Sequence, residues 1–281
     1  MKFGIHAGLW MKTWEDDLTP IFATVAEIGF DGVEVSLLGI GRDRAKAIRG
    51  QAEQCGLELT CSTGLGPEAD PTSADPEIRR NAVSVLTEAI EVTALLGAKG
   101  LAGVVAAPWG AFDPLNKVTR AERSAQTLGQ LDGILAEQGV TLGIEALNRF
   151  ETDLTSTAAE ACALARSTGS KHIGALLDSF HMNIEEKDPP AAIRAAGNML
   201  CHYHVSDNDR GVPGSGRYDF PADAAALKEI GYDGWVVAEM FVIAGNPASA
   251  DLNIWRNIEP DPTQAAIQTL AYLRKVFSDV C

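Results

Sequence analysis

Four side chains that can ligate a metal ion or transfer protons stand at the ends of short apolar segments. Glu145 ends VTLGIE, Asp178 ends IGALLD, His204 lies in CHYHVSD, and Glu239 ends GWVVAE. The separations between them are 33, 26 and 35 residues, each about the length of one strand with its following helix. This spacing predicts that four consecutive strand–helix units bring the four side chains to the same place.

Three carboxylates and one imidazole in one place are costly to bury unless a cation neutralises them. An oxygen-rich ligand set of this kind favours Mn²⁺, Mg²⁺ or Co²⁺ over the sulfur-rich and histidine-rich sites of structural zinc. For any one of the four, a structural ion pair or a helix N-cap is an equally good interpretation. Four such residues, each separated from the next by about one strand–helix unit, favour a metal site. His202 alternates in phase with His204 and is expected to be a core histidine rather than a fifth ligand.

A second group of polar residues follows the first four at short distances. Glu151, His181 and Arg210 each lie three to six residues after one of the expected ligands. Hydroxyls and carbonyls of a sugar need donors and acceptors held in a fixed arrangement, which these side chains can supply. The alternatives are a surface salt bridge, a helix-face contact and a solvated loop charge. Trp14 and Trp109 follow predicted strands and are expected either to line a sugar pocket or to pack on a barrel rim.

A glycine-rich segment, RGVPGSGR at positions 210–217, follows the seventh predicted strand. Many barrels bind phosphate after this strand, so a phosphorylated substrate is one interpretation. Only Arg210 and Arg217 supply positive charge there, among Asp207, Asp209 and Asp219. We therefore expect a flexible loop that covers the substrate rather than a phosphate site.

The elements that must position these residues are eight repeated strand–helix units. The β-branched apolar segments that predict strands are 3–7, 32–37, 57–61, 100–105, 141–147, 173–178, 200–206 and 234–241. Helical stretches between them end near glycines 29, 97, 139, 169, 197 and 231, as helices commonly do. An open doubly wound sheet would need a glycine fingerprint after an early strand, where HAGLWMKTW stands instead. The pattern predicts an α/β protein, a (β/α)₈ TIM barrel forming a single domain over residues 1–281, whose active site lies at the carboxyl ends of the strands.

The amino-acid composition and net charge of the chain indicate which kinds of molecule it can bind. The 281 residues are 46% hydrophobic, carry a formal net charge of −15, and have a sequence pI of about 4.7. An acidic surface repels phosphate backbones and anionic lipids, so we expect neither nucleic acid nor membrane as a partner. No secretory signal or apolar stretch of about 18 residues is present, and we expect a cytoplasmic protein. The five cysteines are scattered without a CxxC pair and are expected to be reduced thiols.

Several longer segments resemble one family of sugar epimerases. GIEALNRFET, LLDSFHMNIEE, HYHVSDNDRGVPGSG and VVAEMF, followed by IWRN, closely resemble the matching segments of the D-tagatose 3-epimerases and D-psicose (allulose) 3-epimerases. The likeness runs from the first predicted strand to IWRN. It implies an enzyme that inverts C3 of a free ketose, acts as a homodimer or homotetramer, and usually holds Mn²⁺, with Co²⁺ or Mg²⁺ as alternatives.

The resemblance also implies a role for each matching position. Its metal ligands match Glu145, Asp178, His204 and Glu239, and its acid/base pair matches Glu145 and Glu239. The residues that hold the O1 to O3 end of the ketose match Glu151, His181 and Arg210, and those that line the pocket match Trp14, Leu65 and Trp109. His6 stands where the family often has an aromatic residue, a difference that bears on sugar preference.

These expectations describe one reaction. A metal bridging O2 and O3 would stabilise a cis-enediolate while two glutamates on opposite faces of the sugar exchange the C3 proton. An aldose–ketose isomerase, a hydroxypyruvate isomerase or a sugar-phosphate epimerase of the xylose-isomerase-like superfamily would use the same groups. The acidic charge disfavours a metal-dependent nuclease, and the two glutamates disfavour a non-catalytic sugar-binding barrel. D-tagatose, D-fructose or D-psicose, and L-ribulose all remain open as substrates.

Overall fold

The computed structural model describes residues 1–278, and its centre is a closed barrel of eight parallel strands. Each strand pairs with the next along the chain, and β8 closes the barrel against β1. The strands are β1 (Lys2–His6), β2 (Gly32–Ser36), β3 (Glu58–Gly64), β4 (Gly100–Val104), β5 (Thr141–Glu145), β6 (Ile173–Asp178), β7 (Leu200–Val205) and β8 (Trp235–Ala238). The prediction of a single-domain (β/α)₈ barrel is confirmed.

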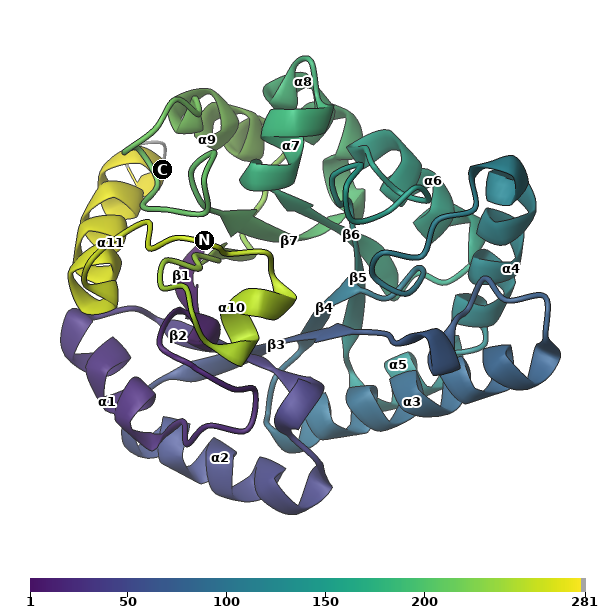
Figure 1. Ribbon diagram of the computed structural model, residues 1–281, viewed down its shortest axis with the longest axis horizontal. Coiled ribbons are helices and arrows are strands. Elements are labelled where there is room, and N and C mark those ends of the chain that lie inside the picture. The colour runs from purple at the N-terminus through teal and green to yellow at the C-terminus, as the bar shows by residue number, and fades with distance from the viewer. Residues whose placement is uncertain (279–281) are drawn as a thin grey trace.

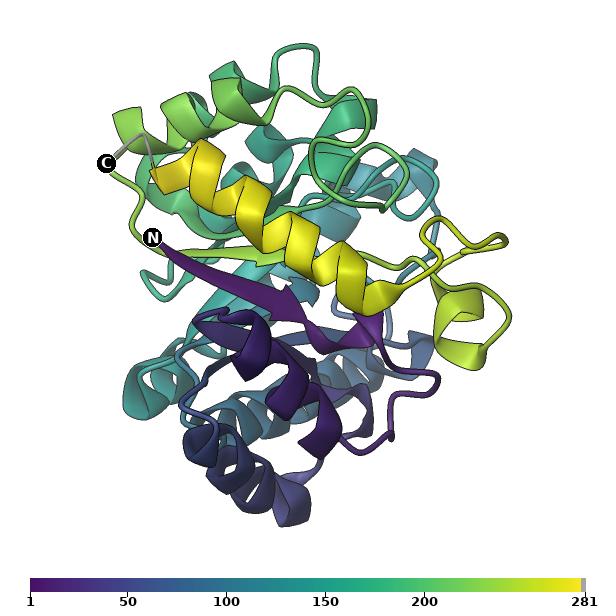
Figure 2. The ribbon, with the colours of Figure 1, turned by 90° about the vertical axis from the view of Figure 1, so that its left-hand side faces the viewer.

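Helices surround this barrel as a ring (Figure 1). They are α1 (Thr19–Ile28), α2 (Arg42–Gln54), α3 (Pro76–Leu95), α4 (Lys117–Gly129), α5 (Asp132–Gln138), α6 (Ala158–Ser167), α7 (Ser179–Glu185), α8 (Pro189–Ala196), α9 (Phe220–Glu229), α10 (Pro247–Asp251) and α11 (Pro262–Ser278). Short 3₁₀ helices lie at Ala7–Leu9, Leu37–Gly39, Pro67–Ala69, Pro114–Asn116 and Gly197–Met199. In Figure 2, β1 runs from the N-terminus towards the side on which α10 lies, so α10 is at the carboxyl end of the barrel.

The strands read as continuous apolar segments because both of their faces are covered. Every residue of β2 and of β6 is buried. The six glycines expected near helix ends all adopt positive φ, from 53° at Gly197 to 98° at Gly29, which a side chain would disfavour. β3 continues to Gly64, three residues beyond the predicted segment. The prediction stopped short because Ser62, Thr63 and Gly64 are residue types that are common in turns.

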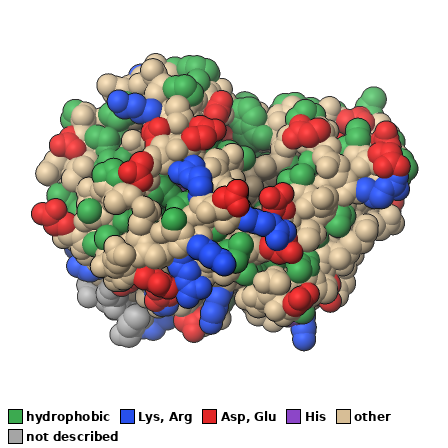
Figure 3. All heavy atoms as spheres, turned by 90° about the horizontal axis from the view of Figure 1, so that it is seen from below, with side chains coloured by type: hydrophobic (Ala, Val, Ile, Leu, Met, Phe, Trp, Pro, Cys, Tyr) green, Lys and Arg blue, Asp and Glu red, His purple; other side chains and the backbone are tan. Residues whose placement is uncertain are grey.

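The outer surface carries interspersed charges of both signs. Figure 3 shows the face made by the helices at the bottom of Figure 1, where acidic and basic side chains lie beside one another. Ion pairs on this side include Arg42 with Glu91 and Arg49 with Glu53. Among the described residues, none of the helices combines the length and the hydropathy needed to span a bilayer. The four described cysteines are free thiols, and Cys281 lies outside the described residues.

A buried carboxyl group lies between β7 and α9. The hydroxyl of Tyr203 donates to Oδ2 of Asp223 at 2.6 Å, while Oδ1 of Asp223 has no hydrogen-bond partner among residues 1–278. Burial raises the pKa of Asp223 from 3.8 to about 6, against the opposing effect of this hydrogen bond. Folding therefore makes the neutral carboxyl easier to form than it is in the unfolded chain.

This group predicts a defined dependence of stability on pH. A carboxyl whose pKa is raised by folding lowers the free energy of unfolding as pH rises through the interval between the unfolded and folded values, here 3.8 to about 6. The full penalty above pH 7 corresponds to at most about 3 kcal/mol. In urea unfolding from pH 4 to pH 8, Asp223→Asn should gain stability relative to the wild type as pH rises. A constant difference between the two proteins would contradict this interpretation.

Candidate active site

The four predicted metal ligands come together at the carboxyl ends of the last four strands. Glu145 ends β5, Asp178 ends β6, His204 is the second-last residue of β7, and Glu239 directly follows β8. The parallel register pairs Asp178 with His204 across β6 and β7. One ligand atom from each of the four lies within 4.8 Å of the others.

This donor set fits a divalent cation. Nδ1 of His204 is buried 3.5 Å from Oε1 of Glu239 and has no hydrogen-bond partner among residues 1–278. A buried nitrogen without a partner is costly, and a cation shared with the carboxylates would remove that cost. Three carboxylates with one imidazole form the mixed donor set suited to Mn²⁺, Co²⁺ or Mg²⁺.

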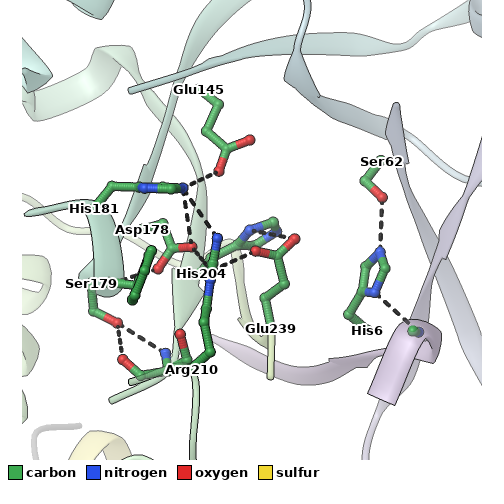
Figure 4. Close-up of polar contacts among 12 residues, drawn as sticks. His6, Ser62, Glu145, Asp178, Ser179, His181, His204, Arg210 and Glu239 are labelled. Atoms are coloured by element: carbon green, nitrogen blue, oxygen red, sulfur yellow. Dashed lines mark hydrogen bonds and ion pairs between the residues drawn. The ribbon is translucent and has the colours of Figure 1, made fainter. Parts of the chain in front are cut away.

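Arg210 extends into the same group of carboxylates, as Figure 4 shows. Its Nη1 atom donates to Oδ2 of Asp178 at 2.5 Å and to Oε2 of Glu239 at 2.8 Å. Its guanidinium carbon lies 4.2 Å from the centre of the Phe180 ring. The backbone of Arg210 has a φ of 67°, an unusual value outside glycine, and its N–H donates to the carbonyl of Asp207 at 2.9 Å. The fold thus holds this side chain in a strained but fixed position.

The two glutamates expected to transfer protons have different electrostatic surroundings. Burial raises the pKa of Glu145, which lies 3.4 Å from Nε2 of His181. Burial would also raise the pKa of Glu239, but the charges of His204 and Arg210 lower it well below its ordinary range. The surroundings therefore shift the pKa values of these two carboxyl groups in opposite directions, as suits an acid/base pair.

A chain of hydrogen bonds connects the residues expected to bind substrate, and it includes one residue that the sequence analysis missed. The backbone N–H of Asn148 donates to Nδ1 of His181 at 3.1 Å, which leaves Nε2 of His181 to carry the ring proton. The Asn148 side chain donates to Oε1 of Glu151 at 2.8 Å. Trp109 donates to Oε2 of Glu151 at 3.0 Å. The motif NRFE contained Asn148, but an asparagine at a strand end gave no separate signal.

Glu34 is the second residue that the sequence analysis missed. It lies inside β2, is fully buried, and places its two carboxylate oxygens 2.8 Å from Nε2 of His202 and 2.8 Å from Nε2 of His204. Burial alone would raise the pKa of Glu34, but the two histidines hold it well below its ordinary range. His202 is buried against Glu34, in keeping with the core position expected for it. The signal was one acidic residue within the apolar segment GVEVS.

The expected pocket residues line one cavity of about 680 Å³ at the mouth of the barrel, within the usual size for small-molecule sites. Its lining includes His6, Trp14, Leu65 and Trp109 together with Glu145, His204 and Glu239. The indole N–H of Trp14 donates to Asp251 at 2.9 Å, a contact that ties α10 to the rim.

His6 forms a polar wall of this cavity (Figure 4), and one of its ring nitrogens lies within 4.8 Å of carboxylate oxygens of Glu34 and Glu239. Gly8 donates its backbone N–H to Nδ1 of His6 at 3.1 Å, so the ring proton is on Nε2, which lies 3.0 Å from Oγ of Ser62. Burial lowers the pKa of His6, which favours the neutral ring. Ser62 therefore accepts a hydrogen bond from His6 and keeps its own hydroxyl proton for another partner.

The glycine-rich loop at 207–217 is organised around a buried carboxylate. Oδ2 of Asp207 accepts the backbone N–H groups of Gly214 at 2.9 Å and Gly216 at 2.8 Å, and Oδ1 accepts that of Arg217 at 3.0 Å. These are the donors that a phosphate group would need from such a loop. Because Asp207 already accepts these backbone N–H groups, they are not available to bind a phosphate.

The fold and the donor set define a (β/α)₈ barrel with a candidate metal centre at its mouth, and comparison with known proteins gives its family. Residues 22–276 match the family described as xylose isomerase-like TIM barrel. The chain belongs to this family.

Curated relatives agree with this assignment over nearly the whole chain. D-psicose 3-epimerase of Enterocloster bolteae is 32% identical over 99% of this chain and 96% of its own length. L-ribulose 3-epimerase of Mesorhizobium japonicum is 34% identical over 97% of this chain and 93% of its own. A crystal structure of D-psicose 3-epimerase in the presence of D-fructose superposes with a TM-score of 0.93 at 31% identity, covering 99% of both chains. The resemblance seen in the sequence motifs is confirmed.

Proposed function

We propose that this chain is a divalent-metal-dependent epimerase that inverts C3 of a free ketose, with Glu145 and Glu239 as the acid/base pair. The observation that carries the proposal is that ligand atoms of both glutamates, Asp178 and His204 lie within 4.8 Å of one another, beside a cavity lined by the two glutamates and His204. The names of the relatives, which are epimerases of D-psicose and L-ribulose, support the same reaction. Glu145, Asp178, His204 and Glu239 would hold the cation.

Inversion of C3 requires a base on one face of the sugar and an acid on the other. The C3 proton of a ketose is acidic only because the neighbouring C2 carbonyl can accept the electron pair. A divalent cation bound by the four residues would act as a Lewis acid for that charge. One glutamate removes the proton, the other returns a proton from the opposite side, and the roles reverse in the back reaction.

The remaining polar residues suit the orientation of the sugar. His181, with its proton on Nε2, and the guanidinium of Arg210 would donate to the O2 end of the substrate. Glu151, held by Trp109 and Asn148, would accept the C1 hydroxyl. These contacts fix C3 relative to the two glutamates, which is the main contribution that substrate-binding groups make to rate.

A free sugar is a better fit than a sugar phosphate. The backbone N–H groups of Gly214 and Gly216 are already bonded to Asp207, and the guanidinium of Arg210 is already paired with Asp178 and Glu239. His6 and Ser62 instead offer neutral hydrogen-bonding groups for hydroxyls. D-tagatose, D-fructose or D-psicose, and L-ribulose are the proposed substrates.

Product analysis by chromatography separates this proposal from its alternatives. We expect C3 epimers from D-fructose, D-tagatose and L-ribulose when Mn²⁺ is supplied, with much lower kcat/KM for the corresponding ketose phosphates. Aldoses as the main product would identify an aldose–ketose isomerase. Preference for phosphorylated ketoses would favour the sugar-phosphate epimerase.

Three finer properties complete the proposal and rest on the family resemblance. Mn²⁺ is the proposed cation, with Co²⁺ and Mg²⁺ as alternatives that metal analysis of the purified protein distinguishes. The proposed assembly is a homodimer or a homotetramer, which light scattering coupled to size exclusion determines. The proposed location is the cytoplasm.

A further inference from the structure

Glu34 has no direct part in the proposed chemistry, yet it is fully buried and lies beside a proposed ligand. β2 is bonded to β1 and β3 in the barrel, whereas His202 and His204 come from β7. The carboxylate therefore reaches across the barrel interior to two side chains of a distant strand. Burying an acidic group at such a place is costly unless its partners are fixed.

The distances determine where the ring protons lie. Each Nε2 atom is 2.8 Å from a carboxylate oxygen, a separation at which two lone pairs would repel each other strongly. A proton on each Nε2 removes this repulsion, so we infer one on both rings, although neither N–H is aligned with its oxygen closely enough to form a hydrogen bond in the structure. With Nε2 facing Glu34, Nδ1 is the ring atom left to bind a cation, and it lies 3.5 Å from Glu239 without a hydrogen-bond partner among the described residues.

We propose that Glu34 is a positioning residue that holds His204 in the tautomer and orientation needed to bind a divalent cation through Nδ1. His202 fixes Glu34 in turn, because it occupies the second carboxylate oxygen and packs edge-on against His204 with ring centres 4.9 Å apart. The inference rests on the proposed metal-dependent function and deepens it. A carboxylate behind a metal-binding histidine orients the ring and raises its basicity.

Glu34→Gln is the variant that tests this role with the least change of shape. The amide keeps the volume but removes the negative charge, and its NH₂ group cannot accept a proton from a histidine. We expect Mn²⁺ affinity of the chelator-stripped protein, measured by titration calorimetry, to fall about 10- to 100-fold. Asp223→Asn is the matched control, since it makes the same change at another buried carboxyl; its Mn²⁺ affinity should equal that of the wild type.

A spectroscopic measurement on the wild type tests the same inference and does not depend on whether Glu34→Gln folds. The chain has five histidines, so ¹⁵N spectra of the histidine-labelled, metal-free protein can be assigned one ring at a time. The inference predicts a proton on Nε2 of His204 and of His202. A neutral His204 ring with its proton on Nδ1 would overturn it.

The outcomes of the calorimetry are distinguishable. Loss of affinity in Glu34→Gln, with the control unchanged, supports the positioning role. Equal Mn²⁺ affinity in Glu34→Gln and the wild type overturns the role of Glu34 and leaves the proposed function intact. Absence of Mn²⁺ binding in the wild type itself would overturn the proposed metal centre, and the inference with it.

Discussion

Replacing Glu145 or Glu239 by glutamine should lower kcat for C3 epimerisation by at least about 10³-fold, near the upper range for general acid/base catalysis. Glutamine keeps the size and shape of the side chain but can neither accept nor release the C3 proton. Both residues line the same cavity and their pKa values are shifted in opposite directions, so neither is expected to substitute for the other.

Loss of a proton carrier must be distinguished from loss of the metal, because both residues are proposed ligands. Mn²⁺ affinity should therefore be measured in the same variants, and kcat determined at saturating Mn²⁺. Glu151→Gln is the matched comparison: it changes another carboxylate at the mouth, and we expect it to raise KM more than it lowers kcat. Substantial turnover by both Glu145→Gln and Glu239→Gln would refute the acid/base assignment.

Removal of the divalent cation should abolish turnover and lower the stability of the fold. Without a cation, the mouth holds the carboxylates of Glu145, Asp178 and Glu239, with Arg210 bonded to only the latter two. Binding to the native state alone stabilises it by about 2.7 kcal/mol when the free cation is at 100 times its Kd. Chelation followed by titration with Mn²⁺ should restore activity and the free energy of unfolding together.

Asp178→Asn provides the control for this experiment. Asp178 is a proposed ligand outside the acid/base pair, and the amide should weaken binding of Mn²⁺ while the two glutamates remain. Added Mn²⁺ should then stabilise the variant less than the wild type at the same concentration. Full activity after exhaustive chelation, or equal stabilisation of both proteins, would contradict the metal dependence.

The barrel and the group of proposed ligands were predictable because both follow from local patterns. Glu145, Asp178 and Glu239 each end an apolar segment, and parallel strands in one barrel bring their carboxyl ends to one mouth. The separation of about one strand–helix unit between these residues then indicated which of them would lie together. None of this required knowledge of which side chains touch.

Glu34 and Asp207 were not predictable in the same way, because their partners are set by three-dimensional contacts. Glu34 lies in the middle of a strand and meets histidines from a strand that is not its neighbour. The role of Asp207 depends on the conformation of a loop, in which Gly214 and Gly216 direct their N–H groups at its carboxylate. The sequence indicated a glycine-rich loop but not what the loop encloses.

The most direct test of the central claim is epimerisation in D₂O. Metal-restored protein is incubated with D-fructose, D-tagatose or L-ribulose, and the products are analysed by NMR for configuration and for the position of deuterium. The proposed reaction predicts C3 epimers that carry deuterium at C3, with no product from the chelated protein. Deuterium at C1 or C2 accompanied by an aldose, or no exchange with any of the three ketoses, would contradict it.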